Sequence, residues 1–250
     1  MGFFQSGSFQ HGTAITPHSD VDYIARIYYS DRPSSSTTIL NTIRDLLKRE
    51  LREVDNVYVA RPTVSLDFAG LVTRYEITPA YLLRTVNEQQ VLLIPAAGGG
   101  WREAAPKAHL EFVAEMDRKH HGDVREIARL LKAWKYQNSV PISSFYLEMR
   151  AAEYGKNNTS IWSLITLSTI VSRLVTTELA AMNDPAGLVS RISACSSERD
   201  RATSLTKLRA LQKDLDEGYR AHKAGDRWNF NRALQAIWGT DFPYCDPETS

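Results

Sequence analysis

The hydrophobic pattern of this chain changes character once, near a glycine triplet at residues 98–100. Before the triplet, short alternating or continuous apolar runs predict strands over 20–29, 57–60, 63–68, 72–77 and 90–94. After it, apolar residues recur every three or four positions, which predicts helices over 107–120, 124–138, 143–153, 160–181, 197–224 and 226–238. A chain that separates its strands from its helices in this way folds as α+β. We therefore predict a sheet lobe at 1–98, a helical lobe at 99–243 and a tail at 244–250.

Two local features refine this picture. Residues 38–54 carry apolar side chains at helical spacing, so we expect one helix inside the sheet lobe. A glycine triplet is either a flexible hinge or a place where backbones approach closely, and here it lies near the predicted boundary.

The composition excludes several classes of protein. The 250 residues include 30 basic and 29 acidic side chains, a net charge of +1, so no stable nucleic-acid partner is expected. The two cysteines form no Cys/His cluster, which excludes a zinc ribbon. The N-terminus has no basic segment followed by an apolar one, and no apolar stretch is long enough for a membrane span. We expect a cytoplasmic protein with no membrane partner.

Two carboxylates near the N-terminus predict a metal site. Residues two apart on a strand point to the same side, so Asp20 and Asp22 lie side by side. Like charges this close repel unless a cation lies between them, and hard oxygen ligands suit Mg²⁺ or Mn²⁺. Upstream, Gly7-Ser8 can offer backbone N–H groups and a hydroxyl to phosphate oxygens. A solvated strand end after a plain turn is the alternative, and the combined pattern favours the site.

The same stretch resembles the polymerase-beta-like nucleotidyltransferases, which carry a Gly-Ser turn, a spacer and Asp-x-Asp on a strand. Three further pieces narrow the resemblance: Tyr75-Glu76-Ile77-Thr78-Pro79-Ala80, Gly98-Gly99-Gly100-Trp101 followed by Pro106-Lys107-Ala108-His109, and Ile237-Trp238-Gly239-Thr240-Asp241-Phe242-Pro243. In this order they are similar to the bacterial cyclic-oligonucleotide synthases (CD-NTases). That family is related to cyclic GMP-AMP synthase and to oligoadenylate synthase. The resemblance covers nearly the whole chain and implies an active site in a cleft between the two lobes.

Two acidic residues compete for the role of third metal ligand. By resemblance, the Pro79-Ala80 that follows favours Glu76, which would complete the set with Asp20 and Asp22. An Asp is commoner there in the family, so the Glu is a departure that shifts the geometry. Asp67 is the alternative ligand, and it could instead face solvent beside a hairpin turn.

The resemblance also implies residues that bind nucleotide. Lys132 and Ser144 would hold the triphosphate of the donor, together with the Gly7-Ser8 turn. From the sequence alone, Ser143 or Ser144 is equally a helix N-cap. Phe145 or Tyr146 could stack on a base, although aromatic residues at helical spacing more often belong to the core.

By resemblance, the expected activity is metal-dependent nucleotidyl transfer that joins nucleoside triphosphates into a cyclic di- or trinucleotide. Such a product acts as a second messenger in antiphage defence, through a downstream effector. The alternatives are transfer of a nucleotide to a protein or small molecule, and a regulator that binds nucleotide with little or no catalysis. The relatives have a helix ahead of the Gly-Ser turn, whereas only six residues precede Gly7 here. We expect such a difference to lower stability or activity.

Overall fold

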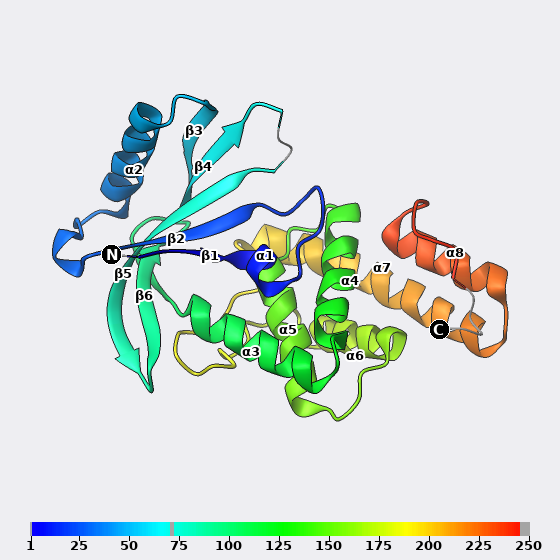
Figure 1. Cartoon of the computed structure of the whole chain (residues 1–250). Helices are drawn as coiled ribbons and strands as arrows, with labels where there is room; N and C mark the ends of the chain where they lie inside the picture. The colour runs from blue at the N-terminus through cyan, green and yellow to red at the C-terminus, as the bar shows by residue number, and fades with distance from the viewer. Residues whose placement is uncertain (1, 71–72, 246–250) are drawn as a thin grey trace. The chain divides into compact units, whose positions relative to one another are not determined.

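A computed structural model describes residues 2–70 and 73–245 of the chain (Figure 1). The predicted strand start at Val72 and residues 246–250 of the predicted tail lie outside the described residues. The chain divides into two compact units, one formed by residues 1–114 with 184–190 and the other by residues 115–183 with 191–250. The first is built around a sheet and the second is helical, so the predicted α+β class is confirmed.

The sheet of the first unit has seven strands, joined in the order β1-β2-β5-β4-β3, with β6 paired to β5 and β7 to β6. Strands β2 and β5 run parallel, and the other pairs are antiparallel. The strands are β1 (Gly2–Ser6), β2 (Val21–Ile27), β3 (Val54–Ala60), β4 (Thr63–Phe68), β5 (Tyr75–Val86), β6 (Gln89–Pro95) and β7 (Trp101–Ala104).

The glycine triplet is a turn within this sheet. Gly99 and Gly100 have φ of +96° and +72°, which glycine adopts without a steric penalty, and they reverse the chain between β6 and β7. The amide of Gly99 donates to the carbonyl of Ala96 at 3.0 Å. Strand β7 was not predicted, because four residues with two charged side chains at the centre carry too little periodicity. The predicted boundary after residue 98 therefore falls inside the sheet.

Helix α2 (Ser36–Glu50) covers one face of this sheet near β3 (Figure 1). Ser35 caps it by accepting from the amide of Thr37, and Leu40 packs against Val57, Val64 and Leu66. On the opposite face, Ile24, Ala80, Leu92 and Ile94 form a second core with Phe4. The remaining helices of this unit are α1 (Gly7–His11), the 3-10 turn η1 (Tyr29–Asp31) and the first part of α3 (Pro106–Lys119).

Residues 184–190 belong to the first unit although the chain on either side of them belongs to the second. The ring Nε2 of His109 lies 2.8 Å from Oδ1 of Asp184, and both side chains are buried. The Asp184 carboxylate also accepts from the backbone amides of Leu188 and Val189. No local sequence pattern predicts this return, because it depends on contacts between distant segments.

The second unit consists of α4 (Asp123–Gln137), α5 (Ser144–Asn157), α6 (Ser163–Thr176), α7 (Glu198–Lys223) and α8 (Arg227–Trp238), with the end of α3. Leu205, Leu208, Leu211 and Leu215 form the buried stripe that the spacing along α7 predicts. The indole of Trp238 donates to the carbonyl of Leu130 at 2.9 Å, so the C-terminal motif is anchored to α4.

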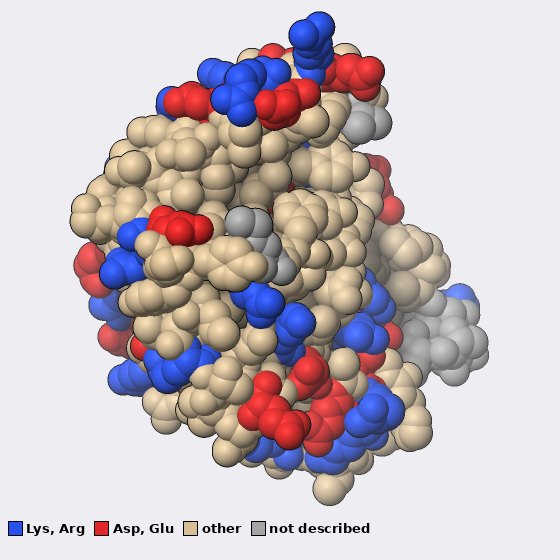
Figure 2. Space-filling model, turned by 60° about the vertical axis from the view of Figure 1, so that its left-hand side comes forward, with Lys and Arg blue, Asp and Glu red and all other residues tan. Residues whose placement is uncertain are grey.

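Within residues 2–70 and 73–245, no helix is long and apolar enough to span a bilayer. On the face drawn in Figure 2, Lys and Arg side chains lie next to Asp and Glu, in keeping with the balanced charge. Cys195 and Cys245 are both free thiols.

Candidate active site

One row of residues crosses four strands of the sheet at the position of the predicted metal site. Asp22 of β2 is the register partner of Glu76 in β5, Glu76 is the partner of Ser65 in β4, and Asp22 is the partner of Ser6 in β1. Register partners point to the same face of a sheet. The four side chains therefore lie on one face, with the two carboxylates next to each other at its centre.

Asp20 is the residue immediately before this strand, since β2 begins at Val21. The amide of Val21 donates to the carbonyl of Arg74 at 2.9 Å, which continues the parallel pairing to the strand end. Asp20 is half-buried. Asp20 therefore lies at the edge of the strand, two residues before Asp22, and its negative charge acts on Glu76.

Gly7 joins the N-terminal turn to this row. Its φ is +66°, and a Cβ at this position would lie 1.8 Å from Oδ2 of Asp22. A side chain cannot fit there, so the turn requires glycine both for its backbone conformation and for its contact with Asp22. The predicted Gly7-Ser8 turn is the start of the short helix α1, whose end is fixed by a bond from the amide of Thr13 to the carbonyl of Ser8 at 2.9 Å.

Two of the predicted metal ligands, Glu76 and Asp20, have raised pKa values. Burial raises the pKa of Glu76, and the negative charge of Asp20 raises it further, while hydrogen bonds from Thr63 and Ser65 oppose the rise. Burial also raises the pKa of Asp20, against the positive charge of Arg74. A bound cation would favour the ionised form of both carboxylates.

The alternative ligand, Asp67, has a different partner. Its Oδ1 lies 3.0 Å from Nε of Arg74, and the two side chains are 34% and 44% exposed. Its charge is already balanced by this ion pair. Glu76 instead lies beside Asp22 in the register, so the geometry favours Glu76 over Asp67 as the third ligand.

The donor atoms of Asp20, Asp22 and Glu76 are hard oxygens, which fit Mg²⁺ or Mn²⁺. Among the residues that the structure describes, no three Asp, Glu, His or Cys side chains are arranged as a metal-binding group. The fit therefore rests on the sheet face shared by Asp22 and Glu76 and on the donor chemistry. The assignment of all three residues as ligands stays a prediction.

In the helical unit, the structure speaks against one predicted nucleotide ligand. The side chain of Lys132 is 0% exposed, and its Nζ lies 2.7 Å from Oε1 of Glu148, which is itself buried. A lysine in a buried ion pair is not available to a triphosphate. Lys132 and Lys135 lie three residues apart on α4, and the sequence does not show which of them is buried. The packing of α4 against α5 distinguishes them, because Lys132 contacts Glu148.

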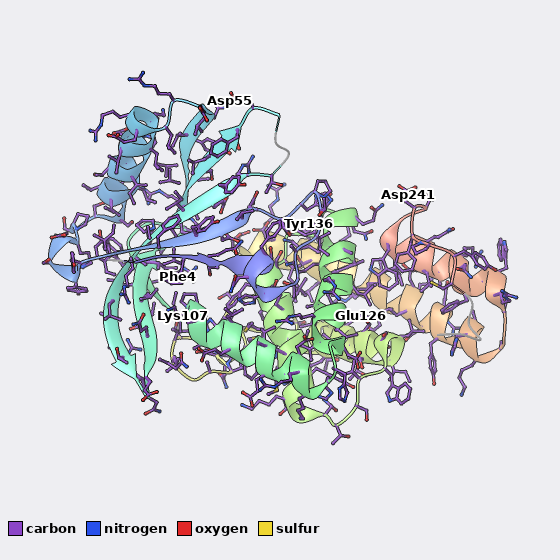
Figure 3. All side chains as sticks on the ribbon, viewed as in Figure 1. Phe4, Asp55, Lys107, Glu126, Tyr136 and Asp241 are labelled. Carbon is purple, nitrogen blue, oxygen red and sulfur yellow. The ribbon has the colours of Figure 1, made fainter. Side chains whose placement is uncertain are left out.

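Lys135 is the lysine that meets the predicted serine. Its Nζ donates to Oγ of Ser144 at 2.7 Å and lies 4.6 Å from the ring centre of Tyr136. All three are half-buried, and Figure 3 labels Tyr136 on α4. Ser143 is the N-cap of α5, because its hydroxyl accepts from the amide of Tyr146 at 3.2 Å. Ser144 is therefore not the capping residue, and its hydroxyl contacts Lys135 instead. Burial and the charge of Lys132 lower the pKa of Lys135.

This cluster combines a cation, two hydroxyls and the N-terminus of a 14-residue helix, which together favour an anion. Tyr146, one of the two predicted stacking residues, is instead a core residue. It is 0% exposed, and its hydroxyl donates to the carbonyl of Ala180 at 2.8 Å. Phe145 is half-buried, and its proposed contact with a base stays a prediction.

Comparison with solved structures identifies the fold. CdnC of Escherichia coli MS115-1, solved with ATP, superposes with a TM-score of 0.79 at 19% identity, covering 97% of this chain and 84% of CdnC. The cyclic AMP-GMP synthase DncV of Vibrio cholerae, solved with a linear intermediate, superposes with a TM-score of 0.71 at 14% identity, covering 99% of this chain and 71% of DncV. The chain has the CD-NTase fold. The predicted resemblance is thereby confirmed.

Curated proteins with similar sequences carry related names. A cyclic AMP-AMP-AMP synthase of Escherichia coli is 26% identical over 70% of this chain and 56% of its own length. A probable cyclic nucleotide synthase of Bacillus cereus is 21% identical over 55% of this chain and 42% of its own length. The chain thus spans about half the length of the curated relatives it matches. No protein-family model matches it.

Proposed function

We propose that this chain is a nucleotidyltransferase that joins nucleoside triphosphates into a cyclic di- or trinucleotide. A ribose hydroxyl of one nucleotide attacks the α-phosphorus of a triphosphate, an O–P bond forms, and the bond to pyrophosphate breaks. The observation that carries the proposal is the register pair of Asp22 and Glu76, with Gly7 packed against Asp22 and Asp20 at the strand edge. The names of the relatives and the shared fold support the same reaction.

Asp20, Asp22 and Glu76 would hold the divalent cations of this site, Mg²⁺ or Mn²⁺. When bound, such ions activate the attacking hydroxyl and stabilise charge on the leaving pyrophosphate. The protein contributes the spacing of the three carboxylates and their partial burial, which strengthens their attraction for a cation. Gly7 and Ser8 supply a compact turn beside Asp22, whose backbone N–H groups and hydroxyl would bind phosphate oxygens.

Lys135 and Ser144 are the residues that we assign to the triphosphate, with Lys135 in place of the predicted Lys132. The ammonium of Lys135 and the hydroxyl of Ser144 are already hydrogen-bonded to each other, so they form a donor pair beside the N-terminus of α5. Phosphate oxygens accept such bonds strongly because they are charged.

ATP is the first substrate to test, because one relative is named a cyclic AMP-AMP-AMP synthase. By resemblance to the family, the product acts as a second messenger that switches on a separate effector during antiphage defence. The effector recognises the product and need not bind this chain.

The test is to incubate the protein with labelled ATP and each other triphosphate, singly and in pairs, with Mg²⁺ or Mn²⁺, and to treat the products with phosphatase. A phosphatase-resistant product that disappears in Asp22→Asn supports the proposal. A labelled protein or small molecule indicates transfer to another acceptor. Bound triphosphate without turnover indicates a regulator. Failure to form any cyclic product with any combination of bases and either metal would overturn the synthase assignment.

A further inference from the structure

A buried serine, Ser65, contacts the carboxylate of Glu76, the predicted third metal ligand. Ser65 of β4 is the register partner of Glu76, and its Oγ lies 3.3 Å from Oε1 of Glu76 as a hydrogen-bond donor. The side chain is 0% exposed. Ser65 therefore cannot meet a nucleotide, and its hydroxyl is directed at the acid.

The alternation along β4 makes this serine unusual. Val64 and Leu66 face the core beneath α2, as apolar residues of a half-buried strand should. Thr63, Ser65 and Asp67 point to the other face, where the carboxylates lie. Ser65 and Thr63 are buried on that face as well, at 0% and 5% exposure, yet neither is apolar. A buried hydroxyl is costly unless it has a partner, and Glu76 is the partner of Ser65.

Thr63 reinforces the same carboxylate. Its hydroxyl also forms a hydrogen bond with the Glu76 carboxylate. The hydroxyl of Thr63 also lies 2.9 Å from the carbonyl of Ala60 as a donor. A hydroxyl has one proton, so Thr63 donates either to Ala60 or to Glu76. Ser65 donates its hydroxyl proton to Glu76 and is the firmer support.

We propose that Ser65, assisted by Thr63, is a positioning residue that orients the carboxylate of Glu76 for a divalent cation. The inference rests on the proposed function, because it concerns the same site. Glu76 reaches one methylene further than the Asp that is commoner in the family, and this longer side chain has an additional rotatable bond. A hydroxyl held at Oε1 restricts the rotation of the carboxylate on the face that Glu76 shares with Asp22. Hydrogen bonds to ligating carboxylates tune metal affinity in this way.

The test measures Mn²⁺ binding directly, by electron paramagnetic resonance on the full chain without nucleotide. Ser65→Ala removes the hydroxyl with the smallest change in volume, and Ser65→Thr restores a hydroxyl. Thr63→Val removes the second hydroxyl at constant shape, and Thr63→Ser keeps it. Ser204→Ala is the matched control, because Ser204 is also a fully buried serine but lies on α7, far along the chain from the site.

We expect Mn²⁺ to bind Ser65→Ala at least about 10-fold more weakly than the unaltered protein. Ser65→Thr and Ser204→Ala should bind Mn²⁺ within about 2-fold of it, since neither removes a donor to Glu76. Thr63→Val should show a smaller loss than Ser65→Ala, and Thr63→Ser little. Thermal melting without metal should place Ser65→Ala and Ser204→Ala close together, so that a folding defect is not mistaken for a binding defect.

Equal Mn²⁺ affinity in Ser65→Ala and in the unaltered protein overturns the positioning role, whatever the activity. Equal losses in Ser65→Ala and Ser204→Ala also overturn it, because a general effect of a buried cavity then explains both. If the unaltered protein binds no Mn²⁺, the metal site itself fails, and with it the proposed function. The two failures are thus distinguishable in one set of measurements.

Discussion

Gly7 and Asp22 are in such close contact that the N-terminal turn and the central carboxylate form one structural unit. A Cβ on Gly7 would lie 1.8 Å from Oδ2 and 2.5 Å from Cγ of Asp22. Strand β1 pairs with β2 along its whole length, with Ser6 as the register partner of Asp22, and this pairing holds the approach in place. The position of the Asp22 carboxylate therefore depends on Gly7, which lies fifteen residues earlier in the chain.

Gly7→Ala should abolish product formation. The substitution adds backbone strain of about 1–3 kcal/mol at a positive φ and also pushes the Asp22 carboxylate from its place. Gly225→Ala is the matched control, because Gly225 has the same φ of +66° with nothing within 4 Å of a new Cβ. Melting temperature and product yield should be measured for both. Similar activity in the two variants would contradict the role of the Gly7–Asp22 contact.

Glu76→Gln should lower the rate of product formation by at least about 100-fold, or roughly 3 kcal/mol, since it removes a charged ligand at constant size. Asp67→Asn should retain most of the activity, because Asp67 is balanced by Arg74 at 3.0 Å. Initial rates at saturating Mg²⁺ compare the two. The reverse order would make Asp67 the third ligand and return Glu76 to a structural role.

Lys135→Met should weaken ATP binding, whereas Lys132→Met should lower the stability of the fold. Losing Lys135 removes a charged donor and should weaken ATP binding by about 1.5–3 kcal/mol, or roughly 10-fold or more, while the fold is retained. Losing Lys132 leaves Glu148 buried without its ion-pair partner and should lower the free energy of unfolding by about 3–5 kcal/mol. Calorimetric titration with ATP and urea unfolding measure the two effects. A stable Lys132→Met protein with lost ATP binding would restore the original assignment.

Acid should weaken the attachment of residues 184–190 to the first unit. Burial by itself raises the pKa of Asp184, but bonds from His109 and from the amides of Leu188 and Val189 outweigh it and lower the pKa to about 2. A carboxyl whose folded pKa lies below its unfolded value of 3.8 stabilises the protein above that value. The contribution, about 2 kcal/mol, is lost as the pH falls from 3.8 through 2.

Urea unfolding of the unaltered protein and of Asp184→Asn checks this sign. The difference in unfolding free energy should be largest above pH 4 and should shrink toward pH 2. Asp55→Asn is the control, because Asp55 is exposed and its substitution should leave the unfolding free energy unchanged at every pH. A difference that grows as the pH falls would contradict the assignment.

Local pattern was enough to predict most of the strands and helices, and the carboxylate pair. The strand over Thr63–Phe68 and the stripe of leucines on α7 follow from periodicities of two and 3.6 residues, which depend only on neighbouring positions. The resemblance carried by the Gly7-Ser8 turn, the Asp20 and Asp22 pair and the three later motifs predicted the CD-NTase fold, which the superposition confirms. The short strand β7 and the turn formed by the glycine triplet were not predicted, because a four-residue strand forms only through its pairing with β6.

The sequence by itself therefore determined the α+β class, the order of the elements and the acidic motif at Asp20 and Asp22. Only the tertiary structure decided that Glu76 lies beside Asp22 and that Ser65 donates a hydrogen bond to Glu76. It also decided that Lys132 is buried against Glu148 while Lys135 donates to Ser144. Each of these depends on strand register or helix packing between segments far apart in the chain. Burial and pairing are set by such long-range contacts, and no local pattern contains them.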